Sequence, residues 1–291
     1  MLTALAEQAV NGLMMGSIYV LVALGMMLIY GVMHVLNFAH GALLMLGGYF
    51  AYFVFATLTG NYLLAIAGAV ILLIPVGALL ERGVFAPLRS NLRNQVIASL
   101  GLVLVIENLV VIVWGPNALQ FRVVSTQATV ALGPIQFALQ HLLIIAATAV
   151  CIAALFAFLH LTKFGTAMRA VAQNPRAAIV VGIDVEKMHK AAFAISMALA
   201  AVGGALLGPL FLVFPQMGDL PLVKGLAGIL LGGMGSIGGA VVGGLAIGVT
   251  EAVSTLFLPT DYRDAITFAV IVVVLLFRPQ GLFGVSTRDD S

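Results

Sequence analysis

The sequence predicts an all-α, polytopic integral membrane protein with about eight spanning helices and one short or re-entrant segment. Of its 291 residues, 62% are hydrophobic and only 8% are charged, whereas a soluble domain carries roughly 25% charged residues. So few charges cannot cover the surface of a water-soluble fold. The composition therefore excludes a soluble enzyme and a disordered chain, and the net charge of +2 gives no indication of a nucleic-acid partner.

Apolar runs between polar breaks mark the expected spans, because about 20 apolar residues cross a bilayer as a helix. The stretch 222–258 is too long for one crossing, and glycines at 232–239 interrupt it. We expect a short segment that runs to these glycines and a full helix, 239–258, that returns. The other candidate spans are 9–32, 38–58, 62–80, 95–114, 137–160, 190–213 and 262–277.

The basic residues predict the orientation. Loops 81–94 and 161–190 and the C-terminal tail hold ten of the 13 Lys and Arg residues, with Arg122, Lys224 and Arg263 on the opposite side. Such an excess marks the cytoplasmic face, so we expect the N-terminus outside and the C-terminus in the cytoplasm. No Lys or Arg precedes Arg82, which is unlike a removable signal peptide.

The lone cysteine, Cys151, lies in an apolar run. One cysteine cannot form a disulfide framework or a cysteine zinc site. We expect no metal site in this chain.

The predicted cytoplasmic loop 161–190 carries the most specific local pattern. A first helix is expected to stop at Asn174, because the residue before a proline avoids the helical region. Asn174 can also cap a second helix that begins at Pro175. Gly182 suits the position after its end, and Asp184 can cap the following membrane helix. The loop is therefore predicted to be a compact pair of short helices.

One side of the first helix, 166–173, is small and apolar. Ala167, Ala170, Val171 and Asn174 share that side at helical spacing. Such a side suits docking into a groove of another protein. A solvated connector that closes the end of the bundle fits the same pattern.

A series of motifs runs in one order along nearly the whole chain. The motifs are Asn11-Gly12, Gly16-Ser17, Tyr19, Leu36–Gly41, Glu81-Arg82, Pro87-Leu88-Arg89, Gly165, Met168-Arg169-Ala170, Asn174-Pro175, Gly182-Ile183, Gly235–Ala240 and Arg278–Gly284. Together they resemble the branched-chain amino acid permeases of ABC importers, the LivH family. The loop 161–190 resembles the cytoplasmic coupling segment of these permeases. It departs from the EAA consensus of other importers, because Arg169 stands where a glutamate precedes the alanine.

The resemblance implies a single transmembrane permease domain, 1–291, in a bacterial inner membrane. It implies a second permease subunit, LivM-like or identical, two cytoplasmic ABC ATPases and a periplasmic binding protein that delivers the substrate. The residues that it assigns to ATPase coupling are Gly165, Met168, Arg169, Ala170, Asn174, Pro175 and Gly182. The chain itself has no phosphate-binding loop, because no lysine follows the glycines at 232–239. We therefore expect ATP and Mg²⁺ to bind only to the partner ATPases, and no cofactor to bind to this chain.

Polar residues within the predicted spans are candidates for the substrate path, because buried ionisable groups in membranes usually face the bundle or a water path. Each of them could instead hold helices together within or between subunits. The candidates are Asn11, Asn37, His40, Glu107, Asn108 and Glu251. Glycines at four-residue spacing, such as Gly12 and Gly16, are expected to let helices approach closely.

Other functions remain as alternatives. A permease for urea, short amides or a sugar would use the same architecture, and a secondary transporter would share the composition without a docking loop. Intramembrane hydrolysis is not expected. The sequence has no H-E-x-x-H motif, and Met234 stands where a G-x-S-x-G motif around Ser236 needs a glycine.

Overall fold

The computed structural model describes residues 2–89, 91–123, 128–132, 135–257, 259 and 262–283. Its contacts divide the chain into two compact units. Unit 1 comprises Met1–Met27, Val123–Thr148 and Pro221–Ser291, and unit 2 comprises Leu28–Arg122 and Ala149–Leu220. The single permease domain expected from the sequence stays a prediction.

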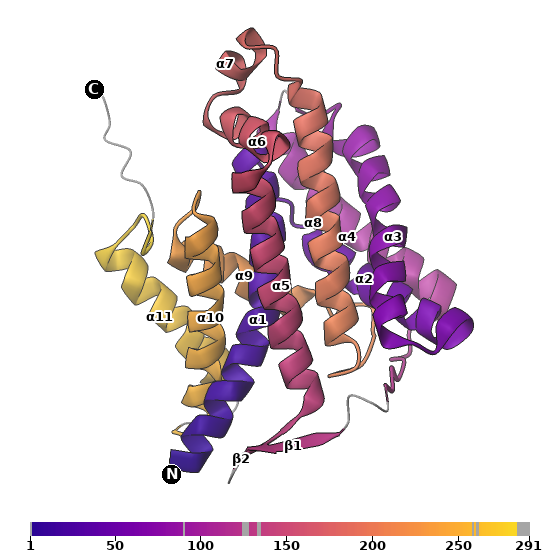
Figure 1. The fold of residues 1–291 in the computed structure, drawn as a ribbon, viewed down its shortest axis with the longest axis vertical. Coiled ribbons are helices and arrows are strands. Elements are labelled where there is room, and N and C mark those ends of the chain that lie inside the picture. Colours follow the sequence, from indigo (N-terminus) through magenta and orange to yellow (C-terminus); the bar gives the residue numbers. More distant parts are fainter. Residues whose placement is uncertain are drawn as a thin grey trace. The chain divides into compact units, whose positions relative to one another are not determined.

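Helices make up most of the described structure (Figure 1). In chain order they are α1 (Leu2–Met33), α2 (His40–Phe53), α3 (Tyr62–Leu80), α4 (Leu92–Trp114), α5 (Leu139–Leu161), α6 (Lys163–Gln173), α7 (Pro175–Val180), α8 (Val185–Leu207), α9 (Asp219–Gly232), α10 (Ile237–Ser254) and α11 (Arg263–Phe277). Helices α2 and α3 continue as π-helical turns, Val54–Thr59 and Glu81–Phe85. Two short strands that the apolar pattern did not predict, β1 (Thr129–Leu132) and β2 (Ile135–Ala138), pair with each other in antiparallel orientation.

Seven helices among the described residues are long and apolar enough to cross a membrane. This confirms an all-α, polytopic membrane bundle. Helix α11, which the sequence predicts as a full span over 262–277, has 15 residues, or about 22 Å at 1.5 Å per residue, against about 30 Å of hydrocarbon. The total of eight full spans and the orientation stay predictions.

The predicted span 190–213 is wrong at both ends. Helix α8 begins at Val185, because the side chain of Asp184 accepts a hydrogen bond from the backbone amide of Lys187 and caps the helix. It ends at Leu207, and the apolar residues beyond it leave the helix. Val213 instead forms an isolated antiparallel bridge with Leu119. Hydropathy alone cannot detect such a change of direction, because both segments are apolar.

Unit 2 is built on helices α2, α3 and α8, which pack side by side (Figure 1). Glycines bring the backbones of α2 and α8 together. A Cβ on Gly204 of α8 would overlap the carbonyl oxygen of Leu44, and one on Gly47 of α2 would lie 2.7 Å from the Cα of Ala201. Real Cβ atoms do not approach so closely, so α2 and α8 require glycine at these two positions.

Glycines also bring the backbones of α1, α9 and α10 together in unit 1. A Cβ on Gly16 of α1 would lie 2.9 Å from the Cα of Leu245, and one on Gly228 of α9 would lie 3.0 Å from the Cα of Gly244. The packing role that the four-residue glycine spacing predicts is confirmed at these positions. The three helices therefore meet through their backbones rather than through long side chains.

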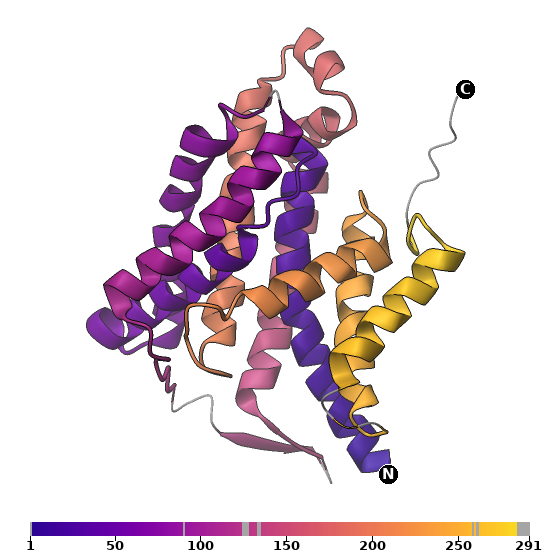
Figure 2. The same cartoon turned by 180° about the vertical axis from the view of Figure 1, so that it is seen from behind.

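The break inside 222–258 lies where the glycines predict it. Helix α9 ends at Gly232, and the turn that follows contains Gly233 and Gly235 with φ of 104° and 102°. These left-handed values favour glycine. Ser236 then caps α10 by accepting a hydrogen bond from the amide of Gly239 at 3.0 Å. Figure 2 shows this turn joining the two helices.

Candidate functional site

The loop 161–190 folds into two short helices, α6 and α7, as its sequence predicts. Both lie near the end of α8 that starts at Val185 (Figure 1). The side chain of Asn174 accepts a hydrogen bond from the amide of Ala177 at 3.0 Å and caps α7, and Pro175 is the first residue of that helix. Gly182 has a φ of 82° just after its end. The first helix starts three residues earlier than expected, because Thr162 caps it.

The exposed side of this segment differs in part from the expected one. Met168 and Val171 of α6 are buried, so the assignment of Val171 to the docking side is wrong. The spacing of small residues predicts the docking side, but α6 packs against both α7 and α8 in the fold. Such packing decides which of its residues are covered. Gly165 is also buried, and a Cβ there would overlap the Phe158 carbonyl oxygen of α5. Ala170 is half-buried.

Many of the other residues of the segment are exposed, although Ala178 is buried. Arg169 and Asn174 are exposed, and Pro175 is half-buried. The end of α7 presents an apolar tip that the sequence pattern does not indicate. Its residues Ile179, Val180 and Val181 are 62%, 86% and 73% exposed.

The other basic loop, 81–94, lies at the end of unit 2 that carries α6 and α7. Arg89 forms an ion pair with Glu81, whose side chain is fully buried. Arg89 also acts electrostatically on Glu186 and His189, in the first two turns of α8. Loops 81–94 and 161–190, which hold most of the basic residues, therefore meet, as an orientation with both on one membrane face requires.

Two candidate polar residues are fully buried at the start of α2. His40 is the first residue of that helix, and its Nδ1 lies 3.4 Å from the hydroxyl oxygen of Ser196. Asn37 accepts a hydrogen bond from the amide of Ala39 at 3.0 Å. Within the described chain, neither Nδ2 of Asn37 nor Nε2 of His40 has a hydrogen-bond partner. A buried polar atom without a partner is costly, so these two atoms suit a polar ligand or water.

The acid Glu107 in α4 lies near a second acid that the sequence pattern does not indicate. Asp219, the first residue of α9, acts electrostatically on Glu107. The preceding residue, Gly218, packs so closely on Gly41 that a Cβ there would overlap the Gly41 carbonyl oxygen. The start of α9 and the start of α2 are therefore neighbours. Asn108 is exposed, and its amide donates to the Leu104 carbonyl oxygen of its own helix.

Glu251 belongs to a buried network of charges in unit 1. It is 3% exposed and accepts a hydrogen bond from the hydroxyl of Tyr19 at 2.9 Å. Arg263 Nε lies 2.7 Å from a Glu251 carboxylate oxygen, and Lys224 Nζ lies 3.4 Å from the same oxygen. Lys224, itself 1% exposed, also donates to Asp264 at 2.6 Å. The four charges join α9, α10 and α11, and the Tyr19 hydroxyl joins α1 to them.

The remaining candidate, Asn11, is half-buried in α1. Its amide donates to the side chain of Gln8 at 3.5 Å. The structure therefore brings Asn37 together with His40, and Glu107 with Asp219, whereas the contact of Asn11 is local.

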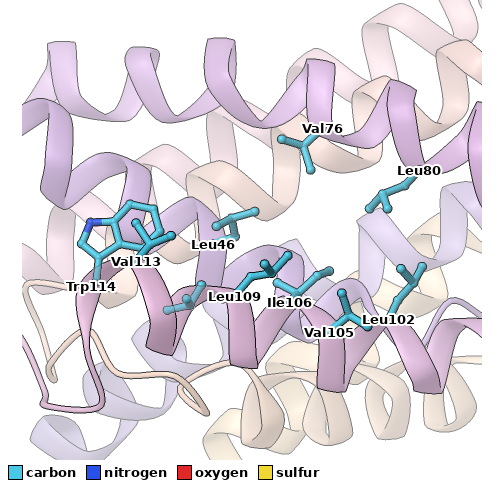
Figure 3. Close-up of a pocket in the computed structure, with 10 residues that line it drawn as sticks. Leu46, Val76, Leu80, Leu102, Val105, Ile106, Leu109, Val113 and Trp114 are labelled. Atoms are coloured by element: carbon cyan, nitrogen blue, oxygen red, sulfur yellow. The ribbon is translucent and has the colours of Figure 1, made fainter.

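An apolar cavity of about 280 Å³ lies between α2, α3 and α4 (Figure 3). Leu46 and Val76 face Ile106 and Leu109 across it, and Trp114 closes one end. Its described lining residues carry no charge. The cavity is therefore unsuited to bind the charged ends of an amino acid.

Known families and proteins match the chain over most of its length. The family described as branched-chain amino acid transport system / permease component matches residues 8–275. The chain is 32% identical to the high-affinity branched-chain amino acid transport system permease protein LivH of Salmonella typhimurium, over 96% of this chain and 95% of that one. It is also 32% identical to the corresponding protein BraD of Pseudomonas aeruginosa over the same shares. No solved structure matches.

The chain belongs to the branched-chain amino acid transport permease family. This confirms the resemblance that the motifs carry. A ribose import permease of Bacillus subtilis matches only 42% of this chain and 40% of its own length, at 28% identity. Together with the seven apolar helices, the relatives establish a multi-pass protein of the inner membrane. The relatives are transport permeases, which fits a role in transport and not in catalysis.

Sequence reasoning missed several residues of the charge network. The sequence pattern predicts no partners for Lys224, Arg263 and Asp264, although each forms an ion pair in the network. One available signal was Lys224 itself, a single cation within the long apolar stretch 222–258. An isolated charge in such a stretch requires an acid close by in the fold.

Proposed function

We propose that the permease is the membrane-spanning subunit of an ATP-driven importer that carries branched-chain amino acids. The observation that supports this most is the 32% identity to LivH over 96% of the chain. The importer would contain a second permease subunit, either a LivM-like relative or another copy. Two cytoplasmic ABC ATPases would bind and hydrolyse Mg·ATP, and a periplasmic binding protein would deliver the amino acid.

The segment α6–α7 is proposed as the contact with an ATPase. Its apolar tip, Ile179, Val180 and Val181, is exposed at an end of unit 2 that also carries basic residues. An exposed apolar cluster on a rigid pair of capped helices suits insertion into a groove of a partner. Arg169 and Ala170 of α6 would contact the rim of the same groove.

The starts of α2 and α9 are proposed as part of the substrate path. Glu107 and Asp219 would attract the ammonium group of an amino acid. The first turn of α2, whose amides point toward the helix start and whose N-cap residue Ala39 provides no side-chain cap, would attract the carboxylate. Asn37 and His40 lie at this helix start, each with a buried polar atom that finds no partner among the described residues. Transporters often place interrupted helices at such a site.

The first test of the function is uptake by the complete transporter. Proteoliposomes are prepared with the permease and its copurified subunits, and with the binding protein. Vesicles whose ATPases face the lumen should accumulate labelled leucine only when the lumen contains ATP. Unlabelled isoleucine and valine should compete, and urea and ribose should not. Competition by ribose or urea alone would support the alternative permeases. Uptake without ATP would support a secondary transporter.

Replacement of Glu107 tests the substrate path. Glu107→Gln keeps the size of the side chain and removes the charge that would attract an ammonium group. We expect at least a tenfold rise in the half-saturating leucine concentration, because a lost charge contact is worth about 1.4 kcal/mol or more. Glu7→Gln, an acid in α1 outside this site, is the control. Equal uptake kinetics in both variants, with normal assembly, would contradict the path.

The docking tip can be tested at Val180. Val180→Asp should reduce ATPase copurification and leucine uptake more than tenfold, because an unpaired carboxylate would have to lose its water at the interface. Val180→Ala, which keeps the side chain apolar, should retain most of both. Thermal denaturation of the isolated permease should not distinguish the two variants, since the tip is exposed. Full copurification of the Val180→Asp variant would count against docking through this tip.

A further inference from the structure

The end of helix α9 is closed by the segment that follows α11. The amide of Leu282 donates to the carbonyl oxygen of Leu231, and the amide of Phe283 donates to that of Gly232, both at 2.9 Å. The last carbonyls of a helix have no partner within it. Where such groups are buried, other parts of the protein must satisfy them. The segment 281–283 therefore supplies hydrogen-bond partners for two of the last carbonyls of α9.

This contact places one backbone directly against another. Gly281 has a φ of 79°, and a Cβ on it would lie 2.5 Å from both the Cα and the nitrogen of Gly233. Gly281 is buried. Any larger residue here would both strain the backbone and push the segment away from the turn between α9 and α10.

Ion pairs of Lys224 hold the first half of α9 against α10 and α11. Lys224 is buried, donates to Asp264 at 2.6 Å and lies 3.4 Å from Glu251. Its Nζ also lies 5.3 Å from the ring centre of Phe268 in α11. Removal of one partner from a buried ion pair is strongly destabilising, because it leaves a charge without compensation. Helix α9 is therefore anchored to α10 and α11 near its beginning and at its end.

We propose that Lys224 and the segment 281–283 are positioning groups that keep α9, α10 and α11 together as one rigid element throughout the transport cycle. Gly228, between these anchors, and Gly232, at the second anchor, pack on the backbone of α10 without room for a methyl group. Sliding of α9 along α10 would break both anchors and this packing at once. The proposal rests on the proposed transport function, since it concerns the cycle that this function requires.

Cross-linking tests whether the element stays closed. Met234 and Leu282, 47% and 39% exposed, follow the closely packed residues Gly233 and Gly281. Both are changed to cysteine in a Cys151→Ser background, which removes the single natural cysteine. In the complete transporter, a short bifunctional thiol reagent should link them in most molecules. The linked protein should keep at least half of its leucine uptake and ATP hydrolysis.

Two outcomes of this experiment would overturn the proposal. Loss of ATP hydrolysis and uptake on linking would show that the segment must leave α9 during the cycle. Absence of linking would show that the contact does not form. The unlinked protein separates this proposal from the proposed function. If the amino acid specificity is wrong, the unlinked protein will hydrolyse ATP without taking up leucine, and ATP hydrolysis of the linked protein still tests the rigid element.

A matched pair of glycine substitutions provides the second test. Gly281→Ala should reduce uptake at least fivefold and lower the thermal denaturation temperature, because the added methyl group meets Gly233. Gly238→Ala is the control, since a Cβ there would meet only the Ser236 hydroxyl at 4.0 Å. Equal uptake and equal denaturation temperatures in the two variants would refute the proposal. If Gly281→Ala does not assemble, the cross-linking result decides.

Discussion

The structure of unit 1 depends on one constraint: the last carbonyls of a helix have no partner within it, and where they are buried other parts of the protein must satisfy them. Helix α9 ends at Gly232, where Leu282 and Phe283 supply amides for two of its last carbonyls. Two glycines with left-handed φ values then reverse the chain, and Ser236 caps the first turn of α10. The glycine turn and the segment after α11 are thus parts of one arrangement, in which each helix end is closed by a neighbour.

The charge network explains why two basic residues lie on the predicted outer side, although most basic residues lie on the predicted cytoplasmic side. Of the three basic residues that the sequence places on the outer side, Lys224 and Arg263 are held by Glu251 and Asp264. Two positive and two negative charges compensate one another, and Arg263 and Asp264 keep part of their side chains exposed. Both features limit the cost of burying Lys224 and Glu251. The two cations therefore serve the packing of α9, α10 and α11.

Local contacts could be predicted from the sequence, and distant ones could not. Asn174 and Asp184 cap helices through amides three residues away, so residue type and spacing are sufficient. The glycine break in 222–258 is equally local. By contrast, Tyr19 bonds to Glu251 across 232 positions, and Asp219 becomes a neighbour of Glu107 only through the fold. The burial of Val171 likewise depends on how α6 packs in the fold and not on its spacing within the helix.

The central claim is that the stretch 222–258 is broken at its glycines, where the chain turns from α9 into α10 against the segment that follows α11. With the orientation that the basic residues predict, this turn faces the cytoplasm. Labelling of a Met234→Cys variant in the Cys151→Ser background tests the claim directly, since Met234 is exposed in that turn. A thiol reagent that cannot cross membranes should label inside-out vesicles, in which the cytoplasmic face is outside, and should not label intact cells. Labelling of intact cells and not of inside-out vesicles would contradict the claim.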